Sequence, residues 1–189
     1  MTHRHFLINK PAGMISQFIN NKTRKKKVLG ELFLFPEGTM AIGRLDTKTE
    51  GLLLLTTDGK ESARIRSEAI EKEYWAQVDG IITENAIAQL QKGVLISNEG
   101  KDYMTKPALA KKLDDVSSLP PSSFKIRDER HGPTSWVSLT LREGKFKQVR
   151  KMTAAVGFPT LRLVRVRIGK LTLGQLKLGE VQEVNSLEV

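Results

Sequence analysis

The sequence predicts an α+β fold in one domain; the first observation below supports the fold class and the second supports the single domain. Short stretches with strand patterns are mixed with short helical stretches, but they do not alternate with the regular spacing of a doubly wound sheet. The chain has 189 residues and is 39% hydrophobic, which suffices for one compact unit or two small fused lobes. We therefore expect residues 1–189 to form a single domain of two fused lobes.

The first third is predicted to contain two strands and one short helix. "HFLINKPAGMISQF" begins with a strand-like apolar run, Phe6–Ile8, and the Lys-Pro pair and the glycine after it indicate a turn. "GRLDTKTEGLLLLTTDG" ends in four consecutive leucines, Leu52–Leu55, which are typical of a short strand buried on both faces. "TDGKESARIRSEA" then indicates a turn followed by a short helix.

A further strand and helix follow in the middle of the chain. "EKEYWAQVDG" predicts a strand on which Tyr74, Ala76 and Val78 share one face. "TENAIAQLQKG" predicts a helix with Thr83 as its N-cap and Gly93 at its end.

Residues 97–130 give weaker signals. "SSLPPSS", residues 117–123, predicts a loop or a hinge between the two lobes. We expect the lobes to divide near residues 60–70.

The last third begins with a strand and a two-sided helix. Residues 136–141 alternate as a half-buried strand does, with Val137, Leu139 and Leu141 on one face. Helical spacing then predicts an apolar stripe and a basic stripe on one helix that ends at Gly157. The apolar stripe is Phe146, Val149, Thr153 and Val156, and the basic stripe is Lys147, Arg150 and Lys151.

The final predicted strand is "TLRLVRVRIG", residues 160–169. One face carries Leu161, Leu163, Arg165 and Arg167, so it changes from apolar to cationic along the strand. Such a face suits a site where a base rests on leucine and phosphates meet arginine.

The charge of the chain favours a polyanionic partner such as nucleic acid. Thirty-one Lys and Arg residues against 21 Asp and Glu residues give a net charge of +10. The run "KTRKKK", Lys22–Lys27, is either a flexible solvated segment or an arm that contacts phosphates, and the overall charge favours the arm.

Composition also excludes several kinds of chemistry. The chain has no cysteine, which excludes disulfides, thiolate zinc sites and cysteine nucleophiles. His3, His5 and His131 lack a ligand-like set of partners, so we expect no metal. No apolar run is long enough to span a membrane and "MTHRHFLINK" is not a secretory signal, so a cytoplasmic location is expected.

Asp46 is the candidate catalytic residue. A single aspartate in a glycine-bounded loop is usually a turn residue, but here the following leucines tether the loop to buried structure. An unpaired carboxylate removed from water costs several kcal/mol, so Asp46 needs a cation, either Arg44 on a shared strand face or Arg150. With no cysteine present, a positioned carboxylate is the main candidate nucleophile or general base.

Tyr74 is a second candidate. A strand aromatic usually packs in the core, but enzymes that act on a nucleobase hold the extracted base against aromatic or apolar side chains. Tyr74 and Leu163 would form such a wall.

Four blocks of the sequence, in order, resemble the RsuA/RluE-type ribosomal RNA pseudouridine synthases. They are the signature "GRLDTKTEGLLLLTTDG", the Lys-Pro element "NKPAGMISQF", the Lys-x-Tyr strand "KEYWAQVDG" and the C-terminal motif "EGKFKQVRKMTAAVGFPTLRLVRVRIG". They span residues 6–169, and such an ordered set is highly specific. Residues 126–165 resemble most the RluE-like branch, which acts on the large subunit.

The resemblance implies an isomerase that converts a uridine of ribosomal RNA, in this branch 23S RNA, to pseudouridine without cofactor or metal. The bond from ribose to the base nitrogen breaks, the base rotates, and a carbon rejoins the sugar. Asp46 matches the catalytic aspartate, which acts either as a nucleophile at the anomeric carbon or as a base that leads to a glycal. The family fold is a central, mainly antiparallel mixed sheet flanked by short helices, with a basic cleft between two lobes.

The resemblance also assigns roles to other residues. Tyr74 matches the tyrosine that packs on the target base and assists proton removal, Arg150 the basic residue that pairs with the aspartate, and Leu163 a residue that lines the base pocket. The residues expected to bind the RNA are Lys10, Arg44, Lys147, Gln148, Lys151, Leu163 and Arg165.

One departure and two alternatives remain. Many RsuA-type relatives carry an N-terminal S4-like RNA-binding domain, whereas the first strand here begins at about Phe6. RNA affinity is then expected from the catalytic domain itself. The resemblance also favours a monomer.

The first alternative is a non-catalytic RNA-binding or ribosome-assembly protein, which has no need of Asp46. The second is a base-acting hydrolase, which would release free uracil.

Overall fold

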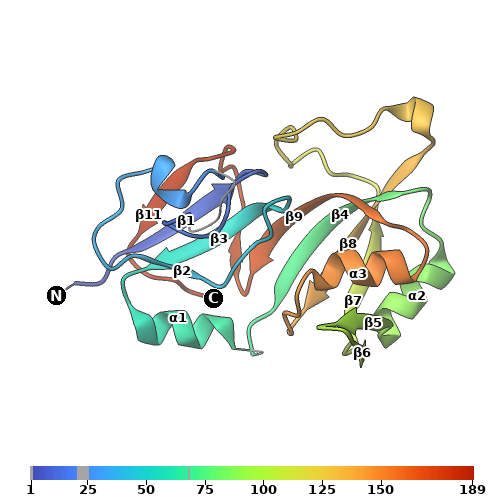
Figure 1. Ribbon diagram of the computed structural model, residues 1–189, viewed down its shortest axis with the longest axis horizontal. Coiled ribbons are helices and arrows are strands. Elements are labelled where there is room, and N and C mark those ends of the chain that lie inside the picture. Colours follow the sequence, from blue (N-terminus) through green and yellow to red (C-terminus); the bar gives the residue numbers. More distant parts are fainter. Residues whose placement is uncertain (1, 21–25, 68) are drawn as a thin grey trace. The chain divides into compact units, whose positions relative to one another are not determined.

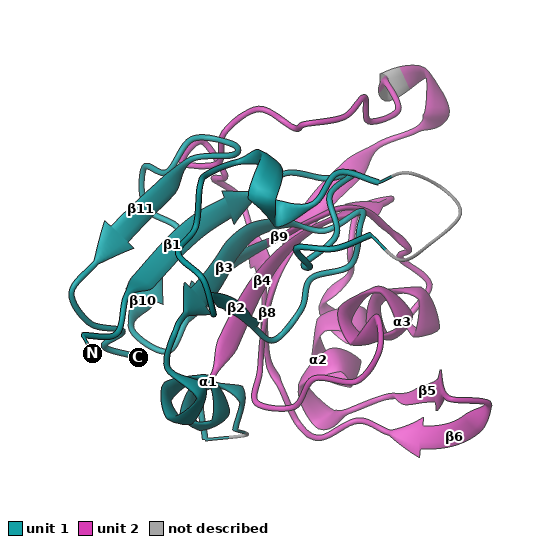
Figure 2. Ribbon diagram, turned by 60° about the vertical axis from the view of Figure 1, so that its left-hand side comes forward, with its two compact units in different colours: residues 1–70, 165–189 teal, residues 71–164 magenta. Residues whose placement is uncertain are grey.

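The chain divides into two compact units (Figure 2). A computed structural model describes residues 2–20, 26–67 and 69–189 (Figure 1). The first unit comprises residues 1–70 and 165–189, and the second comprises residues 71–164. The boundary at residue 70 lies at the end of the range predicted for the lobe division, whereas the return of the chain to the first unit was not predicted. Residues 117–123 were predicted to be a loop or a hinge between lobes; they form a loop inside the second unit, so of the two alternatives the hinge is wrong.

The first unit is built from short strands and one α-helix. Its elements are β1 (His5–Lys10), a 3-10 helix (Leu29–Glu31), β2 (Met40–Ile42), β3 (Glu50–Thr56), α1 (Gly59–Arg66), β10 (Leu171–Thr172) and β11 (Val181–Val184).

The second unit contains longer strands and two α-helices. Its elements are β4 (Lys72–Asp79), α2 (Glu84–Lys92), β5 (Leu95–Asn98), β6 (Lys101–Met104), β7 (Leu109–Leu113), a 3-10 helix (Glu129–His131), β8 (Thr134–Leu141) and α3 (Gln148–Ala155). Strand β9 (Thr160–Ile168) begins in this unit and ends in the first.

The strands form a mainly antiparallel sheet. In the first unit the order is β11-β1-β3-β9, with β2 also paired to β3 and β10 to β9; in the second it is β9-β4-β8-β7. β1 is antiparallel to β3 and β11, and β8 is antiparallel to β4 and β7. Helix α1 packs on β2 and β3, α2 on β7, and α3 on β5 (Figure 1). The predicted α+β class and its antiparallel sheet are confirmed.

Strand β3 is the centre of the first unit. All seven of its residues are buried, and Leu52–Leu55 are completely inaccessible to solvent, which confirms the prediction of a strand buried on both faces. The register with β1 pairs Leu7 with Leu54 and Ile8 with Leu53.

The second unit has one hydrophobic core, to which the predicted faces of β4 and β8 contribute. Ala76, Val78, Val137 and Leu139 are inaccessible to solvent. The prediction that β8 is only half buried is wrong, because Ser138 on its other face is also buried and donates to Glu73 Oε1 at 2.9 Å.

The predicted end signals of α2 are confirmed. Thr83 Oγ1 accepts from the amide of Ala86 at 3.2 Å. Gly93 has φ +100°, and a Cβ there would lie 2.3 Å from the carbonyl oxygen of Thr105, so only glycine fits.

Helix α3 begins later than its spacing predicted. Lys147 is its N-cap in the left-handed conformation, φ +52°, and the helix starts at Gln148. Phe146 therefore precedes the helix and is 62% exposed, so the prediction that it belongs to the buried stripe is wrong. Val149 and Thr153 of the predicted stripe are buried as expected, together with Met152.

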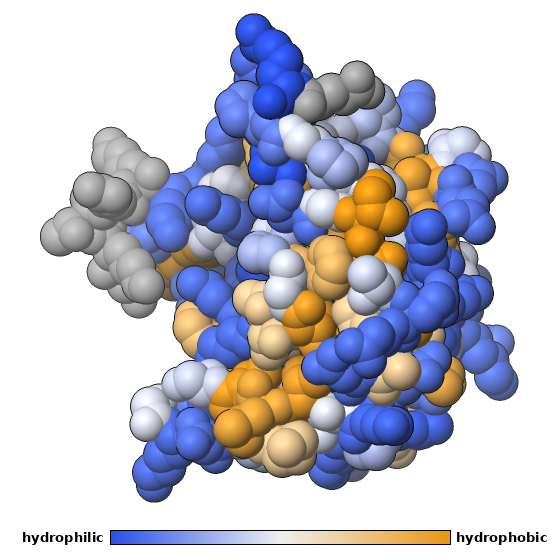
Figure 3. Space-filling model, turned by 90° about the vertical axis from the view of Figure 1, so that its right-hand side faces the viewer, coloured by the Kyte–Doolittle hydropathy of each residue, from blue (hydrophilic) through white to orange (hydrophobic). Residues whose placement is uncertain are grey.

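The second unit also exposes large hydrophobic side chains. In the β5–β6 hairpin Ile96 is buried, whereas Leu95 and its cross-strand neighbour Met104 are exposed. Figure 3 shows a face of the molecule on which hydrophobic residues gather at the surface. Of the helices in the described residues, none combines the length and hydrophobicity needed to cross a bilayer.

Candidate active site

Asp46 lies in the loop between β2 and β3 of the first unit. Gly43 opens this loop with φ +71°, a conformation that favours glycine. The carbonyl of Asp46 accepts from the amide of Thr49 at 2.9 Å, which closes a turn just before β3. Residues 43–49 are not part of a strand, so the predicted shared strand face of Arg44 and Asp46 does not exist.

The segment that follows β1 braces this loop on both sides of Asp46. Ser16 Oγ accepts from the amide of Leu45 at 2.9 Å and donates to the carbonyl of the same residue at 3.0 Å. The amide of Gly13 donates to the carbonyl of Thr47 at 2.7 Å. The backbone before and after Asp46 is therefore fixed by residues more than 25 positions earlier in the chain.

A buried group of charges lies close to Asp46 within the first unit. Lys10 is completely buried, and its Nζ donates to two backbone carbonyls of the following turn at 2.9 and 2.8 Å. Burial lowers the pKa of Lys10 to about 8. Of the nearby charges, Glu50 raises this pKa, Arg165 lowers it and Asp46 raises it. Lys10 is thus a cation that interacts electrostatically with the candidate catalytic carboxylate, which is itself half-buried.

Two predicted RNA ligands of the first unit lie inside the protein. Lys10 has no exposed surface and Arg165 is 5% exposed, with its Nε donating to the carbonyl of Leu52 at 2.8 Å. Both are internal cations, and neither is proposed to touch RNA. Arg44 is exposed, as an RNA ligand must be, and lines a pocket beside the loop.

Tyr74 and Leu163 belong to the core of the second unit. Leu163 is 4% exposed within the hydrophobic cluster, and Tyr74, on β4, is partly buried against the same cluster. The cross-strand neighbour of Tyr74 is Leu139 of β8. Tyr74 therefore has its ring fixed by packing, as a side chain that supports a base requires.

Helix α3 presents the predicted basic residues at the surface of the second unit. Lys147 and Lys151 place their Nζ atoms 5.0 and 5.4 Å from the centre of the exposed Phe146 ring. Arg150 is half-buried, and its Nη1 donates to the carbonyl of Thr160 at 3.4 Å. An exposed ring between two ammonium groups can stack on a base while the lysines attract phosphates.

Gln148 is engaged inside the protein. Its Nε2 donates to Glu143 Oε1 at 2.7 Å, and its Oε1 accepts from the amide of Lys145 at 2.9 Å. It is 4% exposed, so its side chain holds the start of α3 in place and is not proposed to bind RNA.

Sequence reasoning missed Ser16 and Glu50. Ser16 lies in the quoted Lys-Pro block as a small polar residue in a mostly apolar stretch, a signal too weak to reveal its two hydrogen bonds. Glu50 is the first residue of β3 and is fully buried, which its charge alone would argue against.

Of the predicted basic arm at 22–27, residues 22–25 lie outside the described residues. Lys26 reaches the loop that contains Asp46, where its Nζ donates to Thr47 Oγ1 at 3.3 Å.

Comparison with known proteins identifies the family. The sequence model of the RNA pseudouridylate synthase family matches residues 4–155. The chain belongs to this family.

Several members of the family are similar over nearly the whole chain. A ribosomal large subunit pseudouridine synthase E of Xanthomonas campestris pv. campestris is 42% identical over 92% of this chain and 91% of its own length. One from Vibrio parahaemolyticus is 39% identical over 94% of this chain and 72% of its own. A solved structure of a pseudouridylate synthase superposes with a TM-score of 0.76 and 31% identity, covering 96% of this chain and 70% of that one.

Proposed function

We propose that this protein converts a uridine of large-subunit ribosomal RNA to pseudouridine, with Asp46 as the catalytic carboxylate. The observation that carries the proposal is the bracing of Asp46: Ser16 and Gly13 fix the backbone on both sides of it, next to the buried ammonium of Lys10. Relatives 39–42% identical are named ribosomal large subunit pseudouridine synthases.

The reaction requires positioning and one carboxylate. The bond between C1′ of the ribose and N1 of the base breaks, and a bond between C1′ and C5 forms. C5 loses its proton and N1 gains one, so atoms and electrons balance without a cofactor. In this proposal Asp46 either bonds to C1′ or removes a ribose proton, and a fixed, half-buried carboxylate can do both.

Further residues take their proposed roles from the family. Tyr74 would hold the target base and assist removal of the C5 proton, and Leu163 would line the base pocket. The pairing of Arg150 with Asp46 and the basic cleft between two lobes stay predictions from the sequence.

RNA affinity is proposed to come from exposed basic side chains. Lys147 and Lys151 flank the exposed Phe146 ring, which combines attraction for phosphate with a stacking surface. The net charge of +10 is consistent with such a partner.

Asp46→Asn tests the proposal. The amide keeps the size of the side chain but cannot act as nucleophile or base, so conversion should vanish while RNA binding stays within a few-fold. The measurement is pseudouridine mapping across ribosomal RNA with wild type and variant, and Asp102→Asn, a change at an exposed strand position, is the matched control. Normal conversion by Asp46→Asn would refute the catalytic assignment.

Two further assays separate the alternatives. A protein that only binds RNA would produce no pseudouridine with either form, and a hydrolase would release free uracil, which chromatography of the reaction mixture detects. A cytoplasmic location and a monomeric state belong to the same proposal, and light scattering of the purified protein tests the second.

A further inference from the structure

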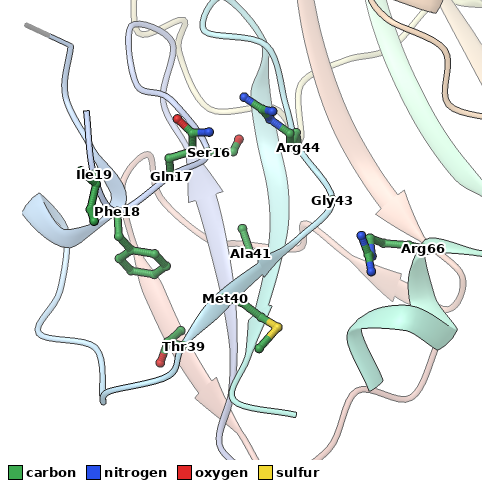
Figure 4. A pocket seen from close by; sticks show the side chains of 10 residues that line it. All are labelled: Ser16, Gln17, Phe18, Ile19, Thr39, Met40, Ala41, Gly43, Arg44 and Arg66. Atoms are coloured by element: carbon green, nitrogen blue, oxygen red, sulfur yellow. The ribbon is translucent and has the colours of Figure 1, made fainter. Parts of the chain in front are cut away.

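An open pocket of about 550 Å³ lies in the first unit beside the catalytic loop (Figure 4). It has the volume of a typical small-ligand site. The mechanism proposed above assigns no role to most of its lining residues. Its walls come from the segment after β1, from β2 and the loop after it, and from the end of α1.

One part of the pocket is apolar and preformed. The Phe18 ring contacts Phe35 edge-on, with centroids 5.4 Å apart, so its position is set by the protein. Ile19 is 70% and Met40 is 37% exposed, although both side chains are large and hydrophobic. In Figure 4 Phe18 and Ile19 lie on one side of the pocket and Arg66 lies on the other.

The other part of the pocket is cationic. Arg44 and Arg66 are both exposed, and no acidic residue is among the described residues that line the pocket. An aromatic and aliphatic surface beside two guanidinium groups matches a nucleotide, because the base stacks on the apolar wall and the phosphate pairs with arginine. The exposed amide of Gln17 offers a donor and an acceptor to the edge of a base.

The pocket is close to the reacting carboxylate. Gly43 lines it, and Asp46 is three residues further along the chain, so their Cα atoms are at most about 11 Å apart. One or two nucleotides of a single strand cover that distance. An occupant of this pocket would therefore be a near neighbour of the nucleotide at Asp46.

We propose that this pocket binds an unpaired nucleotide that flanks the target uridine, with its base against Phe18 and Met40 and its phosphate between Arg44 and Arg66. The proposal rests on the function proposed above and adds to it a specificity site for the RNA sequence or loop shape next to the target. The pocket then selects which uridine is presented to Asp46.

The test combines changes in the pocket with the removal of single bases from the RNA. The probe is a fragment of large-subunit ribosomal RNA around the mapped uridine, in which each of the three nucleotides on either side is replaced in turn by an abasic residue. Binding is measured by filter retention with Asp46→Asn as the background, so that the chemistry does not interfere. One abasic position should weaken binding about tenfold, because a fold-change of about this size is typical for the stacking of one base on an aromatic side chain.

The pocket variants are Ile19→Asp and Arg66→Ala. Ile19→Asp should itself weaken binding of the intact RNA about tenfold. In this variant the abasic substitution that weakens binding to the background protein should cause no further loss of affinity, since the missing base no longer has a site. Leu34→Asp, at a residue of the same unit that is 93% exposed outside the pocket, and Lys60→Ala, on the same helix as Arg66, are the controls and should bind as the background does.

Three results would overturn the proposal: wild-type affinity in both pocket variants, the same abasic penalty in Ile19→Asp as in the background, or equal losses in Leu34→Asp and Ile19→Asp. A wild-type protein that forms no pseudouridine would instead refute the function on which the proposal rests. The two failures are therefore distinguishable.

Discussion

Replacing Ser16 with alanine should separate the bracing of the catalytic loop from the stability of the fold. The change removes one hydroxyl, which is the partner of both the amide and the carbonyl of Leu45. Ser16 and Leu45 are 6% and 7% exposed, so water does not readily take the place of the missing hydroxyl. A buried polar group left without its partner costs about 1–3 kcal/mol, so the two groups together should cost about 2–6 kcal/mol of unfolding free energy.

The expected shift in melting temperature follows from the length of the chain. A protein of this size loses about 2–4 °C for each kcal/mol, so Ser16→Ala should melt roughly 4–24 °C below wild type. Because a displacement of about 1 Å in an active site can cost about a hundredfold in rate, turnover at 15 °C should fall at least about tenfold while the variant is still folded.

Ser135→Ala is the matched control. Ser135 Oγ accepts from the amide of Ile82 and donates to the carbonyl of Gly80, each at 2.8 Å, so it braces a loop of the second unit in the same way. It should lose similar stability and keep its turnover. The assays are melting by circular dichroism and single-turnover formation of pseudouridine. Equal rates for both variants at equal stability would refute a specific role of Ser16 at Asp46.

Four further predictions concern other residues. The unfolding free energy of wild type relative to Lys10→Met should rise by about 3 kcal/mol between pH 8 and 10.5, because in this range the unfolded chain keeps the proton that folded Lys10 has already lost. Urea unfolding at both pH values measures this difference. If the difference did not rise with pH, the burial of a charged lysine would be contradicted. Tyr74→Phe should bind RNA normally and turn over slowly in single-turnover assays, and unchanged turnover would reduce the tyrosine to packing. Arg150→Ala should abolish conversion if it pairs with the catalytic carboxylate, and full activity would exclude that pairing. The double variant Lys147→Ala/Lys151→Ala should reduce the slope of log affinity against log salt by about 1.4, and an unchanged slope would show that these lysines do not contact phosphates.

The elements predicted correctly depend on local signals. Leu52–Leu55 form a strand buried on both faces because a bounded run of leucines has no polar face to expose. Thr83 and Gly93 end α2 where they were expected, since an N-cap hydroxyl and a positive φ are properties of single residues.

The errors arise where distant parts of the chain decide the structure. Phe146 fits a helical stripe by spacing, but the helix begins two residues later, at Gln148, because Lys147 with its left-handed backbone is the N-cap. Lys10 and Arg165 were predicted to bind RNA, but both are buried: the folded sheet brings Glu50 close enough to interact electrostatically with Lys10, and Arg165 donates to the carbonyl of Leu52. The catalytic loop was recognised by its sequence, whereas its brace, Ser16, became visible only in the structure.

The buried charges of the first unit have a consequence for the moment at which the glycosidic bond breaks. Lys10 interacts electrostatically with Glu50, Arg165 and Asp46, so two basic and two acidic side chains lie together here among the described residues. In both routes proposed for Asp46, its carboxylate would become neutral, either as an ester or as an acid, just when the departing uracil gains a negative charge. The basic side chains around it would then carry one surplus positive charge, and its field would favour the anion without any rearrangement of solvent.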